Sequence, residues 1–366
     1  MIIFVTLVVV FLVSFAVSGL VCRIVRARPI YDDAASEQHK THVGTIATGG
    51  GLGIWLGVSI PAVLGGAIVV MLVFWPTLQE YLPDIARAHL PGLWSRLDRL
   101  AQLLGLGSIL AVLGTLDDHY KLNWKIRLLV QTLVAVAAVG LGFRFTLFLD
   151  MPIVTGFLSV LWIVALTNSF NMLDNMDGLS AGVAAICAAF LAAVMFLAPV
   201  ATGPQLFIAA FLALLLGALA GFLLFNNPFR ASLFMGDGGA YFLGFILAAI
   251  TLVATYNEQA APKPQLMLVP LLILAVPLYD TITVVTIRLR EGRSPFVGDK
   301  SHYSHRLVQL GLSRRNAVLT IYLTTTVCCC GALLLYQIDE FGAVVIGMQT
   351  LLMLALIAIL ESRRTR

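Results

Sequence analysis

Two groups of acidic and amide residues have the types and spacing of a metal-binding and phosphate-binding site. Asp117 and Asp118 are adjacent. Neighbours on a helix point about 100° apart, so we expect separate roles, one toward a metal and one toward a nucleophile. The second group recurs every three residues before Gly178 and consists of Asn168, Asn171, Asp174 and Asp177. This spacing covers a broad helix face, so unwinding near Gly178 would let the side chains converge. Mg²⁺ selects such carboxylate and amide oxygens, often together with substrate phosphates, so we predict a Mg²⁺ site that could also take Mn²⁺.

A third acidic residue, Asp237, lies between glycines just before a predicted spanning helix. Backbone N–H groups at the start of that helix could face an anion while the carboxylate meets the metal. Phe234, three residues earlier, could present its flat face to a base, although an ordinary core position is an equally good interpretation.

Basic residues lie just after Asp117 and Asp118 and again after the last acidic group, Asp237. Lys121 lies one helical turn from Asp117 and Asp118 and can pair with either, and Lys125 and Arg127 extend the positive patch. Such a patch suits phosphate, but Lys125 and Arg127 could equally be charges that flank a membrane span. A second basic group lies in residues 289–316 and could also bind phosphate; it contains Arg293, His302, His305 and Arg306. That stretch is too hydrophilic to be buried in lipid, so we predict a folded active-site loop.

The elements that must position these residues are apolar. Hydrophobic residues make up 60% of the 366-residue chain, charged residues make up 11%, and the mean hydropathy is +0.95, values that exclude a soluble globular class. We predict one all-α domain over 1–366, a polytopic transmembrane bundle. Its helices, about eleven, are expected near 1–22, 50–74, 100–116, 126–147, 152–169, 179–199, 205–225, 238–256, 266–288, 317–337 and 341–360. The first run has no Lys or Arg before it, so we interpret it as a retained helix.

The distribution of basic residues predicts the orientation of the bundle. With alternating spans, one side receives most of the 23 Lys and Arg residues, and the other receives only Arg87, Arg96, Arg99, Arg144 and Lys263. The positive-inside rule makes the first side cytoplasmic, with the N-terminus outside and the C-terminus in the cytoplasm. All the groups described above then face the cytoplasm from a multi-pass protein of the inner (plasma) membrane.

In the content and order of its motifs, the chain resembles the polyprenyl-phosphate N-acetylhexosamine-1-phosphate transferase family from Gly44 to about Gly311. The motifs that carry the resemblance are Asp117-Asp118-x-x-Lys121, Asn168-x-x-Asn171-x-x-Asp174-x-x-Asp177-Gly178, Phe234-Met235-Gly236-Asp237, and Arg293-Ser294-Pro295-Phe296 with a histidine motif at 302–306. The resemblance implies Mg²⁺-dependent transfer of a sugar 1-phosphate from a UDP-sugar to polyprenyl (undecaprenyl) phosphate. The products would be polyprenyl-diphosphate-sugar and UMP, in the first membrane step of a cell-envelope glycan pathway.

The resemblance also implies roles for individual residues. Asp237 would be a magnesium ligand, with Asn171 as a second oxygen donor. Asp117 or Asp118 would position or deprotonate the lipid phosphate, and Lys121 would contact phosphate. The nucleotide would be held by three further residues, namely Asp174, Asp177 and, by stacking on uracil, Phe234.

The chain departs from the family pattern in two places, of which the first concerns the shape of a loop and the second bears on the substrate. Ile46 and Ala47 occupy a region where the family usually has a proline before its glycine pair. The histidine motif, His302-Tyr303-Ser304-His305-Arg306, is similar to the His-x-His-His-Arg form of the N-acetylglucosamine branch, with Ser304 in place of the middle histidine. The muramoyl-pentapeptide branch usually has three consecutive histidines. We therefore favour a UDP-N-acetylhexosamine donor such as UDP-GlcNAc, with a phospho-N-acetylmuramoyl-pentapeptide transferase as the alternative.

Functions of other classes fit less well. A membrane transporter predicts acidic residues at the bilayer midplane, where Asp280 is the single candidate, near a cytoplasmic helix end. An intramembrane aspartyl protease using Asp117 and Asp237 explains neither the asparagines nor the basic loops. The expected partners are the sugar nucleotide, the lipid phosphate and the bilayer, with no nucleic acid. Gly217 and Gly221, four apart, are compatible with helix packing within the chain or in a homodimer.

Overall fold

The computed structural model describes residues 2–27, 48–145, 151–197, 205–254, 264–295 and 298–362, and within these ranges it contains helices and no β-strand. The long helices are α1 (Ile2–Ala27), α2 (Gly51–Phe74), α4 (Leu97–Tyr120), α5 (Trp124–Gly140), α6 (Pro152–Leu173), α7 (Leu179–Leu197), α8 (Leu206–Leu223), α9 (Gly236–Val253), α11 (Ala275–Arg290), α13 (Arg314–Leu334) and α14 (Glu340–Ser362). Shorter helices are η1 (Pro76–Tyr81), α3 (Asp84–Trp94), η2 (Pro264–Leu268), α10 (Val269–Ile273) and α12 (Tyr303–Gln309). The all-α prediction is confirmed.

In the described part of the chain, nine helices are long and apolar enough to cross a membrane. A tenth span forms if the bent pair Pro264–Ile273 and Ala275–Arg290 is counted as one. The eleventh predicted span corresponds to α5, whose 17 residues extend only about 25 Å at 1.5 Å per residue. This helix is short because Asn123 caps its start and the chain turns at Gly142, where φ is +93°. The chain is a multi-pass membrane protein, and the direction in which it crosses the membrane stays a prediction.

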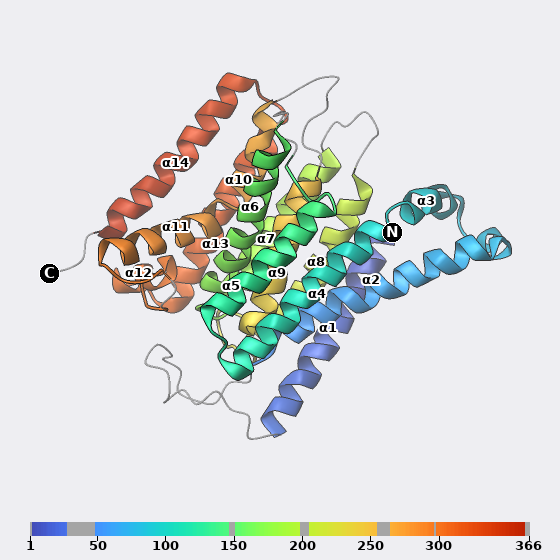
Figure 1. Cartoon of the computed structure of the whole chain (residues 1–366), viewed down its shortest axis with the longest axis horizontal. Coiled ribbons are helices and arrows are strands. Elements are labelled where there is room, and N and C mark those ends of the chain that lie inside the picture. The colour runs from blue at the N-terminus through green and yellow to red at the C-terminus, as the bar shows by residue number, and fades with distance from the viewer. Residues whose placement is uncertain are drawn as a thin grey trace.

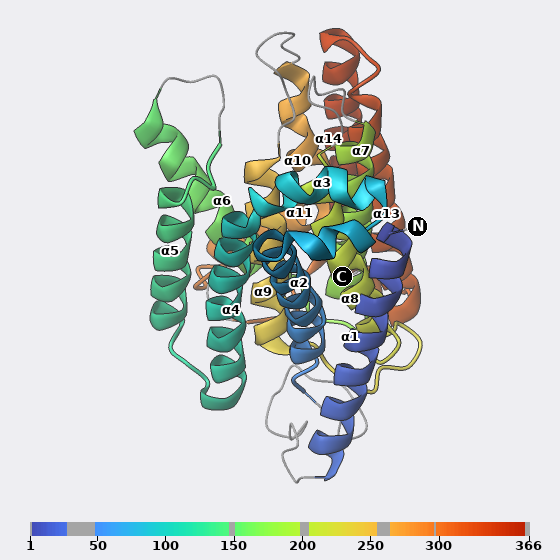
Figure 2. The same ribbon diagram turned by 90° about the vertical axis from the view of Figure 1, so that its right-hand side faces the viewer.

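Helix α9 forms the centre of the bundle, with α4 and α6 packed against it (Figures 1 and 2). In the most apolar stretch of α9, 83% of the residues are buried. The corresponding share for α14, which lies at the edge of the molecule, is 6%. Small residues make this position possible, because a Cβ added to Gly244 would lie 2.6 Å from the carbonyl oxygen of Leu166 on α6. The central helix therefore brings its first residues, which include Asp237, among the ends of its neighbours.

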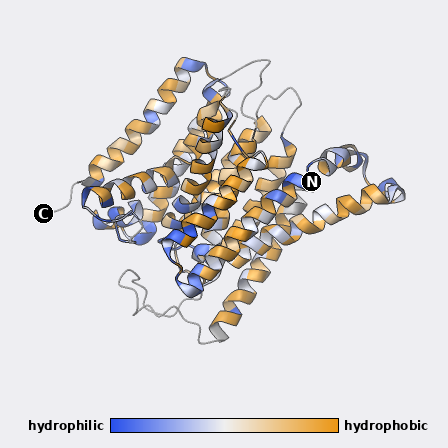
Figure 3. Ribbon diagram, in the orientation of Figure 1, coloured by the Kyte–Doolittle hydropathy of each residue, from blue (hydrophilic) through white to orange (hydrophobic). Residues whose placement is uncertain are grey.

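The outer surface of the bundle is apolar along the helices, whereas polar residues gather near helix ends, notably around α12 and where α4 meets α5 (Figure 3). Exposed Met348, Leu351 and Leu352 on α14 are typical of a surface that contacts lipid. Gly217 and Gly221 pack α8 against α1: a Cβ on either would lie within 3 Å of a carbonyl oxygen, of Leu7 or of Phe11. These two glycines therefore serve packing within the chain.

Candidate active site

Asp117 is buried at the end of α4 and accepts three hydrogen bonds. Arg127 Nη1 donates to its Oδ2 at 2.7 Å, and the Tyr241 hydroxyl donates to the same oxygen at 3.2 Å. The backbone N–H of Leu122 donates to Oδ1 at 2.9 Å, because Lys121 turns the chain back in the left-handed conformation with φ +50°. Asp117, only 4% exposed, therefore fixes the direction of the Arg127 guanidinium.

The adjacent Asp118 has a different partner, as the 100° separation predicts. Its Oδ1 accepts the backbone N–H of Asp237 at 3.1 Å, so it lies at the N-terminus of α9. The Asp237 Oδ1 accepts the Asn171 amide at 2.7 Å, and its Oδ2 is 3.9 Å from Arg127 Nη1. Helices α4, α5, α6 and α9 thus bring two carboxylates, one amide and one guanidinium to a single point.

A glycine-rich turn supports the chain ahead of Asp237. The N–H groups of Gly50 and Gly51 donate to the carbonyl oxygens of Phe234 and Met235, both at 2.8 Å. A Cβ on Gly51 would lie 2.3 Å from the Gly239 nitrogen, so this contact excludes a larger residue. Phe234 itself is half-buried. Residues 44–47 of the same motif, with the Ile46 and Ala47 departure, lie outside the described residues.

The four residues that recur every three positions lie partly on α6 and partly in the turn that follows it. They are Asn168 and Asn171 on the helix, and Asp174 and Asp177 in the turn. Asn168 donates to Gln131 Oε1 on α5 at 2.7 Å. Helix α6 ends at Leu173, and the predicted unwinding near Gly178 is confirmed, with φ +73° at that glycine. Asp174 and Asp177 lie half-buried in this α6–α7 turn (residues 174–178). Burial and the neighbouring carboxylates of Asp118 and Asp177 raise the pKa of Asp174 to about 7, despite a hydrogen bond from the Gly236 N–H.

The α12 segment, residues 298–309, is held by ion pairs and hydrogen bonds. Buried Asp280 on α11 accepts the Tyr303 N–H at 2.6 Å and lies 3.0 Å from His302 Nδ1. Buried Arg306 donates to Glu361 at 2.8 Å. Asp280, the residue that a transporter would need at mid-membrane, is therefore an anchor for α12. The segment is folded, and its role as an active-site loop stays a prediction.

Further contacts join this segment to its neighbours. Arg288 and Arg293 both bind Asp299; burial alone would raise the pKa of the Asp299 carboxyl, but the hydrogen bonds from Arg288 and Ser301 hold it well below its ordinary range. Ser304 donates to Asn175 Oδ1 in the α6–α7 turn. His305 is half-buried, and burial together with the nearby His302 lowers its pKa to about 4. Phe296 lies outside the described residues.

Comparison of the sequence with known proteins assigns the chain to a family. The model of glycosyl transferase family 4 matches residues 100–255, from α4 to α9. Over 323 residues the chain is 31% identical to a decaprenyl-phosphate N-acetylglucosaminephosphotransferase of Mycolicibacterium smegmatis, covering 82% of this chain and 74% of that protein. The chain belongs to glycosyl transferase family 4.

Two further relatives have related names. A probable undecaprenyl-phosphate N-acetylglucosaminyl 1-phosphate transferase of Bacillus subtilis is 36% identical over 225 residues, or 59% of this chain and 60% of that protein. An undecaprenyl-phosphate alpha-N-acetylglucosaminyl 1-phosphate transferase of Escherichia coli is 28% identical over 232 residues, or 60% of this chain and 61% of that protein. The chain thus spans about 60% of the length of these two relatives.

Within this candidate site, several residues have a place that the sequence alone did not show. The sequence left two interpretations of Arg127, a phosphate contact or a charge that flanks a membrane span. In the structure Arg127 forms an ion pair with Asp117 and lies beside Asp237. Tyr241 lies four residues after Asp237, so helical spacing could have placed both on one face of α9. Gln131 lies four residues after Arg127 in the same way. The pairing of Ser304 with Asn175 has no such signal, because it joins segments 129 residues apart.

The oxygen donors of the candidate site fit a hard divalent cation. Asp118, Asp237 and Asn171 offer carboxylate and amide oxygens, and two carboxylates side by side repel each other unless a cation or a proton intervenes. Among the described residues, no three His, Cys, Asp or Glu side chains form a complete metal-binding group. A cation here would therefore complete its coordination with water and substrate phosphates, as Mg²⁺ commonly does.

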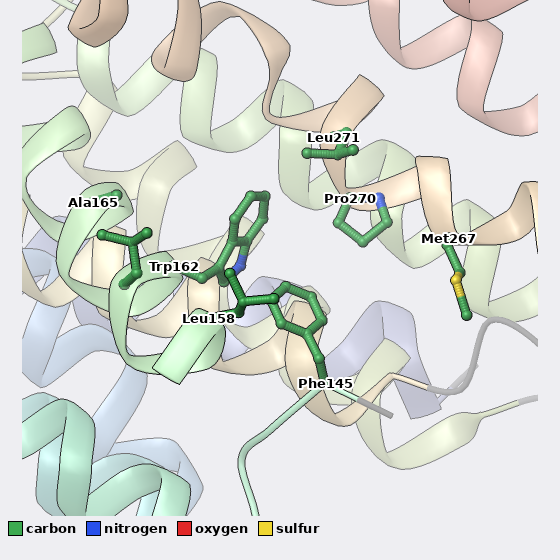
Figure 4. Close-up of a pocket in the computed structure, with 8 residues that line it drawn as sticks. Phe145, Leu158, Trp162, Ala165, Met267, Pro270 and Leu271 are labelled. Carbon is green, nitrogen blue, oxygen red and sulfur yellow. The ribbon is translucent and has the colours of Figure 1, made fainter. Parts of the chain in front are cut away.

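An apolar cavity of about 320 Å³ lies farther along α6 (Figure 4). Its lining consists of Phe145, Leu158, Leu161, Trp162, Ala165, Met267, Pro270 and Leu271. The Trp162 ring is fixed by a hydrogen bond from its Nε1 to Thr251 at 3.0 Å. Ala165 precedes Asn168 by three residues, so one helix carries both the cavity wall and part of the polar site.

Proposed function

We propose that this protein transfers N-acetylglucosamine 1-phosphate from a UDP-sugar to polyprenyl phosphate, in a Mg²⁺-dependent reaction at the cytoplasmic face of the plasma membrane. An oxygen of the lipid phosphate forms a bond to the sugar-bearing phosphorus, the bond from that phosphorus to the bridging oxygen breaks, and UMP leaves with that oxygen. The observation that carries the proposal is the convergence of Asp118, Asp237, Asn171 and Arg127 from four helices. The names of the relatives support the acceptor and the sugar.

Charge is the main physical problem of this reaction, because a lipid phosphate must approach a diphosphate. Phosphoryl transfer depends chiefly on positioning and on neutralising charge. Arg127, aimed by Asp117, supplies a fixed positive charge beside Asp237. Asp118, Asp237 and Asn171 would hold Mg²⁺, which when bound supplies further neutralisation of the phosphoryl oxygens. A phosphate with a second pKa near 6 is already largely ionised at neutral pH, so the acceptor needs no general base.

The bilayer side of the site supports a long apolar acceptor. The cavity beside Trp162 is lined by carbon-rich side chains, and α6 leads from it to Asn168 and Asn171. A polyprenyl chain lying along α6 would bring its phosphate to the polar end of that helix. The α12 segment, with its Lys300 and His305, and the neighbouring Arg293 would contact the nucleotide sugar from the other side.

Purified protein in detergent tests this proposal. We expect UMP release and a lipid-linked sugar product when UDP-GlcNAc, polyprenyl phosphate and Mg²⁺ are all present, and neither product when one is omitted. Asp237→Asn should abolish the reaction, whereas Asp98→Asn, on the exposed far end of α4, should not. Transfer from UDP-N-acetylmuramoyl-pentapeptide instead would favour the muramoyl alternative. Absence of transfer from any UDP-sugar would contradict the proposal.

A further inference from the structure

The break between α10 and α11 leaves one backbone carbonyl without its helical donor. The two helices are bent by 67°, and α11 contains Pro277, which has no N–H. The carbonyl of Ile273, four residues earlier, would accept that missing bond in a regular helix. The helical hydrogen bonds on both sides of this carbonyl are intact. The Leu274 N–H donates to the carbonyl oxygen of Pro270 at 3.0 Å, and the Leu278 N–H donates to that of Leu274 at 3.1 Å.

Two thiols from other helices take the place of the missing donor. Cys187 on α7 donates to the Ile273 carbonyl oxygen with Sγ 3.1 Å away, and Cys329 on α13 donates to the same oxygen with Sγ 3.7 Å away. All three residues are buried, Ile273 being 1% exposed and both cysteines 0%. A buried carbonyl without a partner is costly in an apolar interior, and prolines in membrane helices persist where neighbours satisfy the freed group.

The direction of α11 beyond this bend matters for the candidate site. Asp280 lies three residues after Pro277 and holds His302 and the Tyr303 N–H. Ser304, next in α12, donates to Asn175 in the α6–α7 turn. A change in the angle between α10 and α11 would therefore move the anchor of α12 relative to the turn that carries Asp174 and Asp177.

We propose that Cys187 and Cys329 are positioning residues whose S–H groups cap the Ile273 carbonyl, fix the bend before α11, and so hold α12 against the α6–α7 turn. The expected effect on turnover rests on the proposed function, whereas the hydrogen bonds and their effect on the bend are independent of it. The role of the thiols is to donate to this one carbonyl, so any group that restores a donor should replace them.

A double-mutant cycle with Pro277 separates two effects of the thiols, namely the hydrogen bonds that they donate and the space that their side chains fill. The Cys187→Ala/Cys329→Ala pair removes both donors, and the Cys187→Ser/Cys329→Ser pair keeps an O–H on each. Both pairs are compared in the wild-type and Pro277→Ala backgrounds, since an alanine at 277 supplies the missing N–H. The readouts are the thermal midpoint in detergent, the rate of limited proteolysis in the α12 segment, and kcat and KM. Cys328→Ala is the matched control, because this buried neighbour points about 100° away on α13.

In the wild-type background we expect the alanine pair to lower the midpoint, to speed cleavage of the α12 segment and to lower kcat about tenfold, the change that corresponds to a lost buried hydrogen bond. The serine pair should stay within about twofold of wild type, and Cys328→Ala should behave likewise. In the Pro277→Ala background the effect of the alanine pair should largely disappear.

Equal effects of the alanine pair in both backgrounds would overturn the proposal, because space filling does not depend on residue 277. A serine pair as damaging as the alanine pair would overturn it as well, and this comparison still decides if Pro277→Ala fails to fold. Should the wild-type protein show no transferase activity, the proposed function fails, while the midpoints and proteolysis rates continue to test the thiol caps.

Discussion

Replacing Gly114 by alanine is expected to separate α4 from α9 at the point where they carry Asp118 and Asp237. A Cβ at Gly114 would lie 2.4 Å from the carbonyl carbon and oxygen of Asp237 and 2.4 Å from the Gly238 nitrogen. Ordinary contacts of this kind begin near 3.4 Å. The two backbones must therefore move apart by about 1 Å, and a misplacement of this size can cost about 100-fold in rate.

Gly105, on the same helix, provides a matched control, because a Cβ there meets nothing within 4 Å. Both changes add the same methyl group and the same gain in helix propensity, about 1 kcal/mol. We expect Gly114→Ala to lower kcat for UMP release by about 100-fold and to lower the thermal midpoint, since overpacking typically costs about 1–3 kcal/mol. Gly105→Ala should keep wild-type activity, and its thermal midpoint should equal or slightly exceed that of wild type. Equal activity of the two variants would refute the claim that close approach of α4 and α9 builds the site.

Three other perturbations follow from the same geometry. Arg127→Ala should lower kcat by about 100-fold or more, as loss of a fixed charge at a reacting phosphate does, whereas Lys125→Ala, on the exposed side of α5, should have little effect in the same assay. Because the folded protein keeps the pKa of His305 near 4, below the ordinary 6.5, the unfolded chain binds more protons between these values. Stability should therefore fall as the pH falls through this window, and His305→Asn should flatten that part of a plot of thermal midpoint against pH; an unchanged plot would contradict the burial of this ring. Asp280→Ala should speed proteolytic cleavage of the α12 segment, while Asp84→Ala, fully exposed on α3, should not.

Much of the fold was predictable because apolar composition over about twenty residues is a strong signal for a spanning helix. The count differed where a local feature intervened: α5 ends at Gly140 before the turn at Gly142, whereas the expected span continued to 147, so this helix is too short to be an unambiguous span. The proline in α11 was visible in the sequence, but the 67° bend was not, since it depends on which neighbours can satisfy Ile273.

The candidate site was predictable in its residue types more than in its contacts. Carboxylates and asparagines at three-residue spacing indicated hard oxygen ligands, and Asp118, Asp237 and Asn171 do lie together. The sequence could not show that Arg127 and Tyr241 share the Asp117 carboxylate, because that contact depends on how α4, α5 and α9 pack. Asp117 thus has protein partners on both oxygens, and Asp118 faces the start of α9.

The α12 segment illustrates a different limit. Its lysine, its arginine and its two histidines have the composition of a phosphate site, and their role in binding stays a prediction. In the structure Arg306 pairs with Glu361, and His302 pairs with Asp280. Composition alone could not separate charges that hold the segment in place from charges that face a substrate, because both require the same residue types. His302 and Arg306 are buried in these pairs, whereas His305 is half-buried and is our candidate for substrate contact.

Manganese binding measured by electron paramagnetic resonance tests the central claim most directly, namely that oxygen donors from distant helices gather around one divalent ion. Purified protein with UDP-GlcNAc is titrated with Mn²⁺, and wild type is compared with Asp118→Asn, Asp237→Asn and the exposed control Asp98→Asn. The account predicts one bound ion per chain in wild type and in the control, displaceable by Mg²⁺, and at least about tenfold weaker binding in each of the other two variants. Unchanged binding in Asp237→Asn would contradict it.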